Sequence, residues 1–236
     1  MTTETTASAG LAIFDMAGTS IDERNEVYRV LREAVEREGA RFTDEEFQKW
    51  MGTEKHWAIR NLLKIGGVEA DDALVDSAFA WFHEELAATY TEQPPTPMPR
   101  MEQAFQQLRA QGIKVGLTTG FSRHITDIIL QAMGWTVGDG ESNTVDVTVC
   151  GDEVPDGRPA PDMIQRVMER TGVTDPARVI SVGDTLVDVQ SAQAATVFSV
   201  GVLSGHLTNE DFQDISADAV LEYAADVVDL PQVAGE

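Results

Sequence analysis

The feature of this sequence that most constrains its fold is the regular alternation of short apolar segments with amphipathic segments after residue 100. The apolar segments are rich in β-branched residues, which favours buried strands, and the segments between them carry apolar residues at helical spacing. The predicted strands lie at residues 114–118, 146–149, 178–182 and 197–202, and the predicted helices at residues 102–111, 122–133, 162–171 and 186–195. Strands that alternate with helices form a parallel sheet covered by helices on both faces. The sequence therefore predicts an α/β fold with a doubly wound, Rossmann-like parallel sheet.

A further buried strand is predicted at residues 11–14, and it ends at Asp15. The segment after it, up to about residue 93, has no strand pattern and instead predicts four helices. The first ends at Gly39, the second begins with a capping box of Thr43 and Glu46, the third is capped by Thr53, and the fourth covers residues 73–90. This pattern predicts an α-helical cap inserted after the first strand of the sheet.

We expect two domains from this arrangement. Residues 1–22 and 97–236 would form the Rossmann-like core, and residues 23–96 the helical cap. The proline-rich stretch at residues 94–99 makes a stiff connection between them. We expect the cap to move as a body, hinged near residues 21–23 and 96–99.

Composition narrows the range of partners. The formal net charge of −23 disfavours nucleic acid and anionic membranes, because both require clustered Lys and Arg. No apolar stretch approaches the roughly 18–20 residues of a membrane span, and residues 1–10 resemble a polar leader more than a secretory signal. With Cys150 as its single cysteine, the chain cannot form an intrachain disulfide, so we expect a reducing cytoplasm. A homodimer is a candidate assembly.

Polar residues gather at the predicted ends of the strands, where open parallel sheets bind their ligands. Asp15 ends the first strand, Thr118, Thr119 and Gly120 end the second, and Asp184 ends a later one, with Asp188 one helical turn beyond. Carboxylates from different strands can share a hard divalent ion such as Mg²⁺. Arg158 and Thr119 can then bind phosphoryl oxygens while Asp15 attacks phosphorus.

In this order, the segment from Asp15 to Thr19, then Thr119, Arg158 and the segment from Gly183 to Asp188 resemble the four motifs of the haloacid dehalogenase superfamily. The resemblance covers nearly the whole chain. It implies that Asp15 is the nucleophile, that Thr119 and Arg158 assist catalysis, and that substrate contacts come from Gly18, Thr19, Gly120 and Arg158. It also implies Mg²⁺ held by Asp15, Asp184 and the Ala17 carbonyl, with Asp188 in support.

Ala17 departs from the usual pattern of that superfamily, in which a second aspartate at this position protonates the leaving alcohol. The branch that carries alanine here is phosphonoacetaldehyde hydrolase, whose cap lysine forms a Schiff base with an aldehyde substrate. The segment from Met51 through Gly52 to Lys55 is similar to the lysine segment of that branch. The resemblance implies that Lys55 is catalytic, that Met51 binds substrate, and that the enzyme cleaves the carbon–phosphorus bond of phosphonoacetaldehyde or a related phosphonate.

Two positions differ from that branch. Its enzymes place a histidine three residues after the lysine, where this chain has Ala58, and a tyrosine where this chain has Phe121. The sequence thus predicts a phosphonatase-like hydrolase of a small anionic phosphonate. The alternative is an Mg²⁺-dependent phosphomonoesterase acting on a small phosphorylated metabolite. A dehalogenase is disfavoured because Asp184 and Asp188 are retained, and intact Asp15 argues against a non-catalytic phosphate-binding module.

Lys55 has to lose its proton to act as an amine nucleophile, and a lysine with an ordinary pKa near 10.4 is almost entirely protonated at pH 7. We expect burial under the cap to lower its pKa, and Glu54 to oppose that shift if it points inward. His56 is expected to be a solvent-facing or supporting residue rather than a base, and Cys150 to be a packed thiol. Trp50, Trp57, Trp81 and Phe82 are expected to pack the cap.

Overall fold

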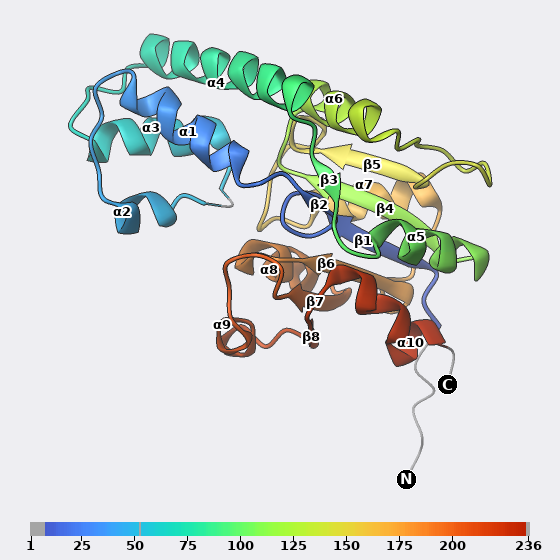
Figure 1. Ribbon diagram of the computed structural model, residues 1–236. Coiled ribbons are helices and arrows are strands. Elements are labelled where there is room, and N and C mark those ends of the chain that lie inside the picture. Colours follow the sequence, from blue (N-terminus) through green and yellow to red (C-terminus); the bar gives the residue numbers. More distant parts are fainter. Residues whose placement is uncertain (1–7, 52, 235–236) are drawn as a thin grey trace.

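The computed structural model describes residues 8–51 and 53–234 and contains a central sheet of six parallel strands (Figure 1). The strand order is β5-β4-β1-β6-β7-β8. The strands are β1 (Leu11–Asp15), β4 (Lys114–Thr119), β5 (Val147–Cys150), β6 (Val179–Gly183), β7 (Phe198–Val202) and β8 (Ala219–Leu221). The chain starts in the middle of the sheet, builds outward through β4 to β5, and then returns to the other side of β1. Asp15 therefore ends a central strand with neighbours on both sides.

Strand β1 is buried on both faces because helices cover each of them. Alternate residues such as Ala12 and Phe14 pack in the core on the side of α5 (Met101–Ala110) and α6 (Arg123–Met133). Leu11 and Ile13 point the opposite way, into a second core formed with α7 (Asp162–Thr171) and α8 (Leu186–Ala194). This alternation is the period-two geometry of a strand, and it explains why the segment is a continuous apolar run in sequence.

The helical segment between β1 and β4 lies beside the sheet at the carboxyl ends of its strands (Figure 1). Asp15 is the last residue of β1. It contains α1 (Glu26–Glu36), α2 (Asp44–Gln48), α3 (Lys55–Ile65) and α4 (Asp72–Glu92). Helices α1, α3 and α4 pack on one another, and α4 also packs on α6 next to the sheet. The chain enters this segment through β2 (Ile21–Asp22) and leaves through β3 (Thr96–Pro97), which pair as antiparallel strands.

The structure confirms the predicted fold class, an α/β protein with a Rossmann-like parallel sheet and an inserted helical segment. Predicted strand and helix bounds agree to within about two residues, except that α1 ends at Glu36, before the predicted end at Gly39. One capping assignment is wrong: the cap of α3 is Glu54, whose carboxylate accepts from the backbone N–H groups of His56 and Trp57, and Thr53 does not cap that helix. The capping box of Thr43 and Glu46 is present at α2. The domain limits and the hinge stay predictions.

Several elements were not anticipated. Strand β8 completes the sheet and α9 (Asn209–Asp214) precedes it. The described part of the chain ends with a 3₁₀ helix, η3 (Ala224–Asp229), and α10 (Pro231–Ala234). Of the aromatic residues expected to pack the helical segment, Phe82 is buried and Trp50 and Trp81 are half-buried, but Trp57 is 53% exposed. None of the helices in the described parts of the chain is long and apolar enough to cross a membrane.

Candidate active site

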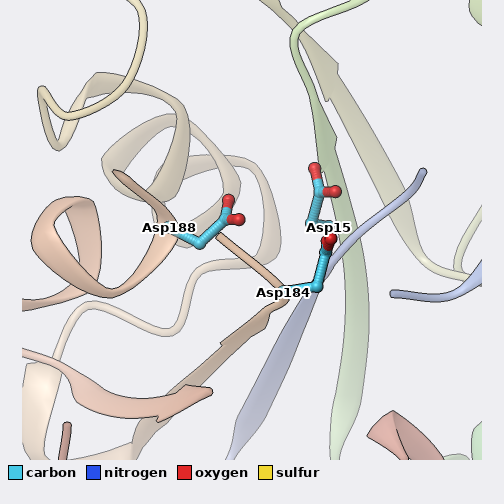
Figure 2. Close-up of side chains that lie close together, drawn as sticks. All are labelled: Asp15, Asp184 and Asp188. Atoms are coloured by element: carbon cyan, nitrogen blue, oxygen red, sulfur yellow. The ribbon is translucent and has the colours of Figure 1, made fainter. Parts of the chain in front are cut away.

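Three carboxylates meet at the carboxyl ends of β1 and β6 (Figure 2). Asp15 ends β1, Asp184 follows β6 directly, and Asp188 lies in the first turn of α8. All three residues are buried, and each offers an oxygen that lies within 4.8 Å of the oxygens of the other two. Buried carboxylates at this spacing repel one another unless a cation lies between or beside them.

Arg158 supplies one positive charge to this cluster. Its Nη2 lies 2.7 Å from Asp15 Oδ1, its Nε lies 2.8 Å from Asp188 Oδ1, and Nη2 also donates to Thr118 Oγ1 at 2.8 Å. The guanidinium thus joins the ends of β1 and β4 to the start of α8. A planar fork with several donors is suited to phosphoryl oxygens as well as carboxylates.

One arginine does not neutralise three carboxylates. Burial, reinforced by the charge of Asp188, raises the pKa of Asp15 to about 7, although Arg158 opposes the shift. Burial also raises the pKa of Asp184 well above its usual range, and the charges of Asp15 and Asp188 act in the same direction. The pKa of Arg158 is raised because the neighbouring carboxylates outweigh the effect of its own burial. A divalent cation at this position would remove the excess negative charge, and an all-oxygen donor set suits Mg²⁺.

The turn after β1 holds Asp184 against the strand ends. Thr19 Oγ1 donates to Asp184 Oδ1 at 2.8 Å. Gly18 has φ +83°, and a Cβ built there would lie 2.5 Å from Asp184 Oδ2. Gly205, from the loop after β7, approaches the same carboxylate from another side, since its Cβ would lie 2.3 Å from Oδ2. Because both residues lack a Cβ, the backbone can approach the Asp184 side chain closely from two sides.

The polar residues at the end of β4 have different neighbours. Thr119 is buried, and its Oγ1 accepts from the backbone N–H of Phe121 at 3.1 Å. Thr118, not Thr119, contacts Arg158. Gly120, directly after the strand, lines a cavity together with Arg158.

Two cavities lie between the helical segment and the sheet, and Thr53 lines both. The first, of about 370 Å³, includes Ala17, Gly18, Met51 and Asp184. The second, of about 200 Å³, includes Lys55, Gly120 and Arg158. The structure therefore brings Lys55 to the arginine side of the carboxylate cluster, whereas Met51 lies in the first cavity. Gly52, also part of the predicted lysine segment, lies outside the described residues.

Lys55 is half-buried at the start of α3, where its Nζ donates to the backbone carbonyl of Thr53 at 2.7 Å. Burial lowers its pKa to about 8, while the charges of Glu54 and Asp15 oppose the shift and that of Arg158 assists it. The Glu54 carboxylate is occupied as the cap of α3, with backbone N–H donors at 2.8 and 2.7 Å. The amine therefore lies close enough to the carboxylate cluster to be influenced by its charge.

Cys150 and His56, which the sequence offered as weaker candidates for a functional role, each contact another side chain. Cys150 is fully buried, its Sγ lies 3.2 Å from Thr126 Oγ1, and burial raises the pKa of the thiol to about 12, which agrees with a packed side chain. His56 pairs with Asp76 at 2.8 Å on the outside of the helical segment.

Comparison with known proteins identifies the family to which the chain belongs. The sequence model described as haloacid dehalogenase-like hydrolase matches residues 12–202, which contain all three carboxylates and Arg158. The chain belongs to this family.

Curated relatives of this haloacid dehalogenase-like hydrolase include several that carry the name phosphonoacetaldehyde hydrolase. The protein from Bacteroides fragilis is 31% identical over an alignment of 246 positions that covers 94% of this chain and 88% of the relative. The protein from Parabacteroides distasonis is 31% identical over an alignment of 205 positions that covers 82% of this chain and 75% of the relative.

Solved structures agree on the fold. A phosphonoacetaldehyde hydrolase-like protein from Oleispira antarctica has a TM-score of 0.78 and 25% identity, covering 98% of this chain and 96% of that one. CbbY from Rhodobacter sphaeroides, solved in complex with phosphate, has a TM-score of 0.76 and 18% identity, covering 93% of this chain and 96% of that one. The chain is therefore a hydrolase of the haloacid dehalogenase type.

The sequence placed Thr118 among the polar residues at the strand ends but gave it no role, and three further residues near the site of this hydrolase were not found. Thr118 binds Arg158, Gly205 packs on Asp184, and Glu23 lines the first cavity. His83, on α4, lines the second cavity with Lys55. Gly205, Glu23 and His83 come from segments that reach the site only through tertiary packing, and their sequence context carries no signal.

Proposed function

We propose that this hydrolase cleaves the carbon–phosphorus bond of a small phosphonate that carries an aldehyde, such as phosphonoacetaldehyde. The observation that supports it most is Lys55, an amine with a pKa of about 8, in the same cavity as the phosphoryl-binding candidate Arg158. The names of the curated relatives point the same way.

Lys55 would act on the aldehyde end of the substrate. With a pKa of about 8, about one molecule in ten carries the free amine at pH 7, compared with one in a few thousand for an ordinary lysine. The amine adds to the aldehyde carbon and water leaves, which gives an iminium. This group accepts the electron pair of the carbon–phosphorus bond when that bond breaks, so the leaving carbon becomes an enamine.

Asp15 would act on the phosphoryl end. Its carboxylate attacks phosphorus as the carbon leaves, which gives an aspartyl phosphate that water then hydrolyses. Arg158 and the backbone of the turn from Gly18 to Thr19 orient the phosphoryl oxygens. Asp15, Asp184 and the Ala17 carbonyl would hold Mg²⁺, with Asp188 in support, and the ion when bound supplies positive charge that keeps the carboxylates ionised and offsets the charge of the phosphoryl group.

Ala17 fits this chemistry because an enamine leaving group needs no acid at that position. An alkoxide leaving group would need an acid there.

We also propose that residues 23–96 act as a cap over residues 1–22 and 97–236, hinged near residues 21–23 and 96–99. Closure would exclude water from the two cavities that lie between these parts.

Borohydride trapping tests the proposal. The protein is incubated with Mg²⁺ and phosphonoacetaldehyde, treated with borohydride, digested and analysed by mass spectrometry for a reduced adduct on Lys55. Lys55→Arg should abolish both the adduct and carbon–phosphorus cleavage, because a guanidinium keeps the charge but forms no imine. Lys64→Arg, at the exposed end of the same helix, is the matched control and should behave as the wild type.

Asp15→Asn separates the two halves of the reaction. It should retain the Lys55 adduct but release no phosphate. If Lys55→Arg instead keeps the natural activity within a few-fold of wild type, the Schiff-base function is wrong. Activity on phosphate monoesters that survives loss of Lys55 would identify the protein as a phosphomonoesterase.

A further inference from the structure

Besides Lys55 and Arg158, the second cavity is lined by ionisable side chains that have no role in the chemistry proposed above. Its lining includes five ionisable side chains: Glu54, Lys55, His83, Asp152 and Arg158. Imine formation needs a proton taken from nitrogen after the amine attacks, and a proton given to oxygen before water leaves. One of these five groups has to carry that proton, or bulk water has to enter the cavity.

The acidic groups are already occupied by backbone donors. Both oxygens of Glu54 accept from N–H groups at the start of α3. Both oxygens of Asp152 accept from the backbone N–H of Arg123, at 3.0 and 3.1 Å. Arg158 is held by Asp15 and Asp188, and a guanidinium does not release a proton in this pH range.

His83 differs from these groups. It lies on α4 beside Phe79, which meets its ring edge-on with centroids 4.4 Å apart, and its Nδ1 lies 3.5 Å from Ser122 Oγ. Among the residues that the structure describes, its Nε2 has no hydrogen-bond partner. Burial lowers the pKa of the imidazole, with His124 acting in the same direction and Asp152 and Glu54 opposing it. The ring is therefore neutral at pH 7 and can accept a proton.

Among the described residues that line this cavity, no other side chain offers a comparable group. Ala58, three residues after Lys55, does not line the cavity, is fully buried inside the helical segment and has no polar side-chain atom. Phe121 lines the cavity with an apolar ring. Ser122, the N-cap of α6, has a hydroxyl whose pKa lies too far from neutrality for it to exchange protons alone, but it can hold the imidazole in place.

We propose that His83 is the proton carrier of imine formation at Lys55, with Ser122 positioning its ring. This proposal rests on the proposed function. The free amine of Lys55 adds to the aldehyde carbon, and Nε2 of His83 moves one proton from the new ammonium to the alkoxide, which gives a carbinolamine. His83 then takes a second proton from solvent and gives it to the hydroxyl, which leaves as water while the nitrogen lone pair forms the iminium. The net change is amine plus aldehyde plus one proton from solvent to iminium plus water.

The experiment measures the rate at which the Lys55 adduct forms. Excess protein with Mg²⁺ is mixed with phosphonoacetaldehyde, quenched with borohydride after increasing times, and analysed by mass spectrometry. His83→Gln should slow adduct formation by about 10²-fold or more, within the range for loss of a general acid–base group. Glu84→Gln, at the exposed next position on α4, is the matched control and should leave the rate unchanged.

A second variant distinguishes proton transfer from a packing effect. His83→Ala should be equally slow, and added imidazole should restore part of its rate in proportion to the neutral imidazole present. Stabilisation of each variant against heat by orthovanadate plus Mg²⁺ reports on an intact phosphoryl site and should match the wild type.

The outcomes separate the two proposals. If the wild type forms the adduct and His83→Gln forms it at the same rate, His83 is not the proton carrier, and the proposed function stands. If His83→Gln is slow but imidazole does not rescue His83→Ala, the role of His83 is structural, and this inference is wrong. If the wild type forms no adduct at all, the proposed function fails and this inference fails with it.

Discussion

In the proposed function, Ala17 occupies the position that decides which leaving group the site can serve. It lines the first cavity beside Asp184 and lies two residues from Asp15. Because Asp15 and Asp184 already repel each other, a further carboxylate at this position would add to that repulsion.

We predict that Ala17→Asp lowers phosphonate cleavage and opens weak activity on phosphate monoesters. The new acid can protonate an alkoxide, for which general acid assistance is typically about 10²–10⁴-fold, and its charge weakens binding of an anionic substrate. Steady-state assays on a phosphonate and on p-nitrophenyl phosphate measure both effects. Ala17→Asn, similar in size but uncharged, is the control. If it gains the same monoesterase activity, the proton is not the cause.

In the proposed function, Lys55 makes the chemistry depend on pH. Burial lowers its pKa in the folded protein to about 8, so the free amine increases as pH rises toward that value. We predict that the rate of Lys55 adduct formation rises about tenfold per pH unit below pH 8 and levels off above it. Borohydride trapping from pH 6 to 10 measures the profile. A rate that keeps rising to pH 10 would show that the pKa of Lys55 is not lowered.

At the scale of single residues, the sequence was sufficient to predict which polar side chains at the strand ends come together in the site. Asp15 and Asp184 could be placed in one site because the carboxyl ends of parallel strands share one edge of the sheet. Arg158, in the loop before α7, was assigned from its resemblance to a family motif. Lys55 was found through resemblance alone. His83 and Gly205 could not be found, because the packing of α4 on α6 and the path of the loop after β7 depend on tertiary contacts.

The short connection between β2 and α1, where the chain enters the helical segment, contains a buried ionisable side chain. Glu23 follows β2, and its Oε2 accepts from the backbone N–H of Val27 at 2.9 Å and from Tyr90 Oη at 2.8 Å. Burial raises the pKa of Glu23, and the pKa of Tyr90 is raised well above its usual range by burial and by the Glu23 charge. This contact joins the start of α1 to the end of α4.

We predict that Tyr90→Phe lowers the free energy of unfolding by about 1–3 kcal/mol, because a buried carboxyl group then loses one of its donors. Urea unfolding followed by circular dichroism measures the change. Tyr223→Phe removes a hydroxyl from a half-buried tyrosine and is the control, for which we expect little change. A Tyr90→Phe protein as stable as the wild type would mean that Glu23 finds another donor or a water molecule.

At the scale of elements, periodicity was a good guide to the long, regular segments and a poor one to the short segments. Helix α7 was predicted with its observed bounds, because its apolar residues repeat at helical spacing. Strands β2 and β3 are only two residues long, and β8 only three, so they have no repeating pattern. The cap of α3 was misplaced because both Thr53 and Glu54 can accept from a helix N-terminus.

The whole molecule carries a net charge of −23, which acts against the binding of an anionic substrate. Arg158 opposes this field locally but is itself held between Asp15 and Asp188. Distant surface charges are screened by salt over about 10 Å at 0.1 M and about 30 Å at 0.01 M, whereas buried pairs are screened much less.

We therefore predict that kcat/KM for a phosphonate substrate rises when the NaCl concentration increases from about 0.01 to about 0.15 M, because repulsion of the anion is reduced while the buried site is little affected. Initial rates at fixed Mg²⁺ and pH measure this, and sucrose of matched osmolality is the control. If kcat/KM falls steadily over the same range, attraction by Arg158 and the bound cation outweighs the overall charge.

The antiparallel pair of β2 and β3 also has a consequence for how the chain folds. Strands β1 and β4 are neighbours in the sheet, yet almost one hundred residues separate them in sequence. Because β2 and β3 bring the two ends of the helical segment together, this segment forms one closed loop between β1 and β4. The entropic cost of closing such a loop grows only slowly with its length. A helical segment of different length or composition could therefore occupy the same place without altering the pairing of β1 with β4.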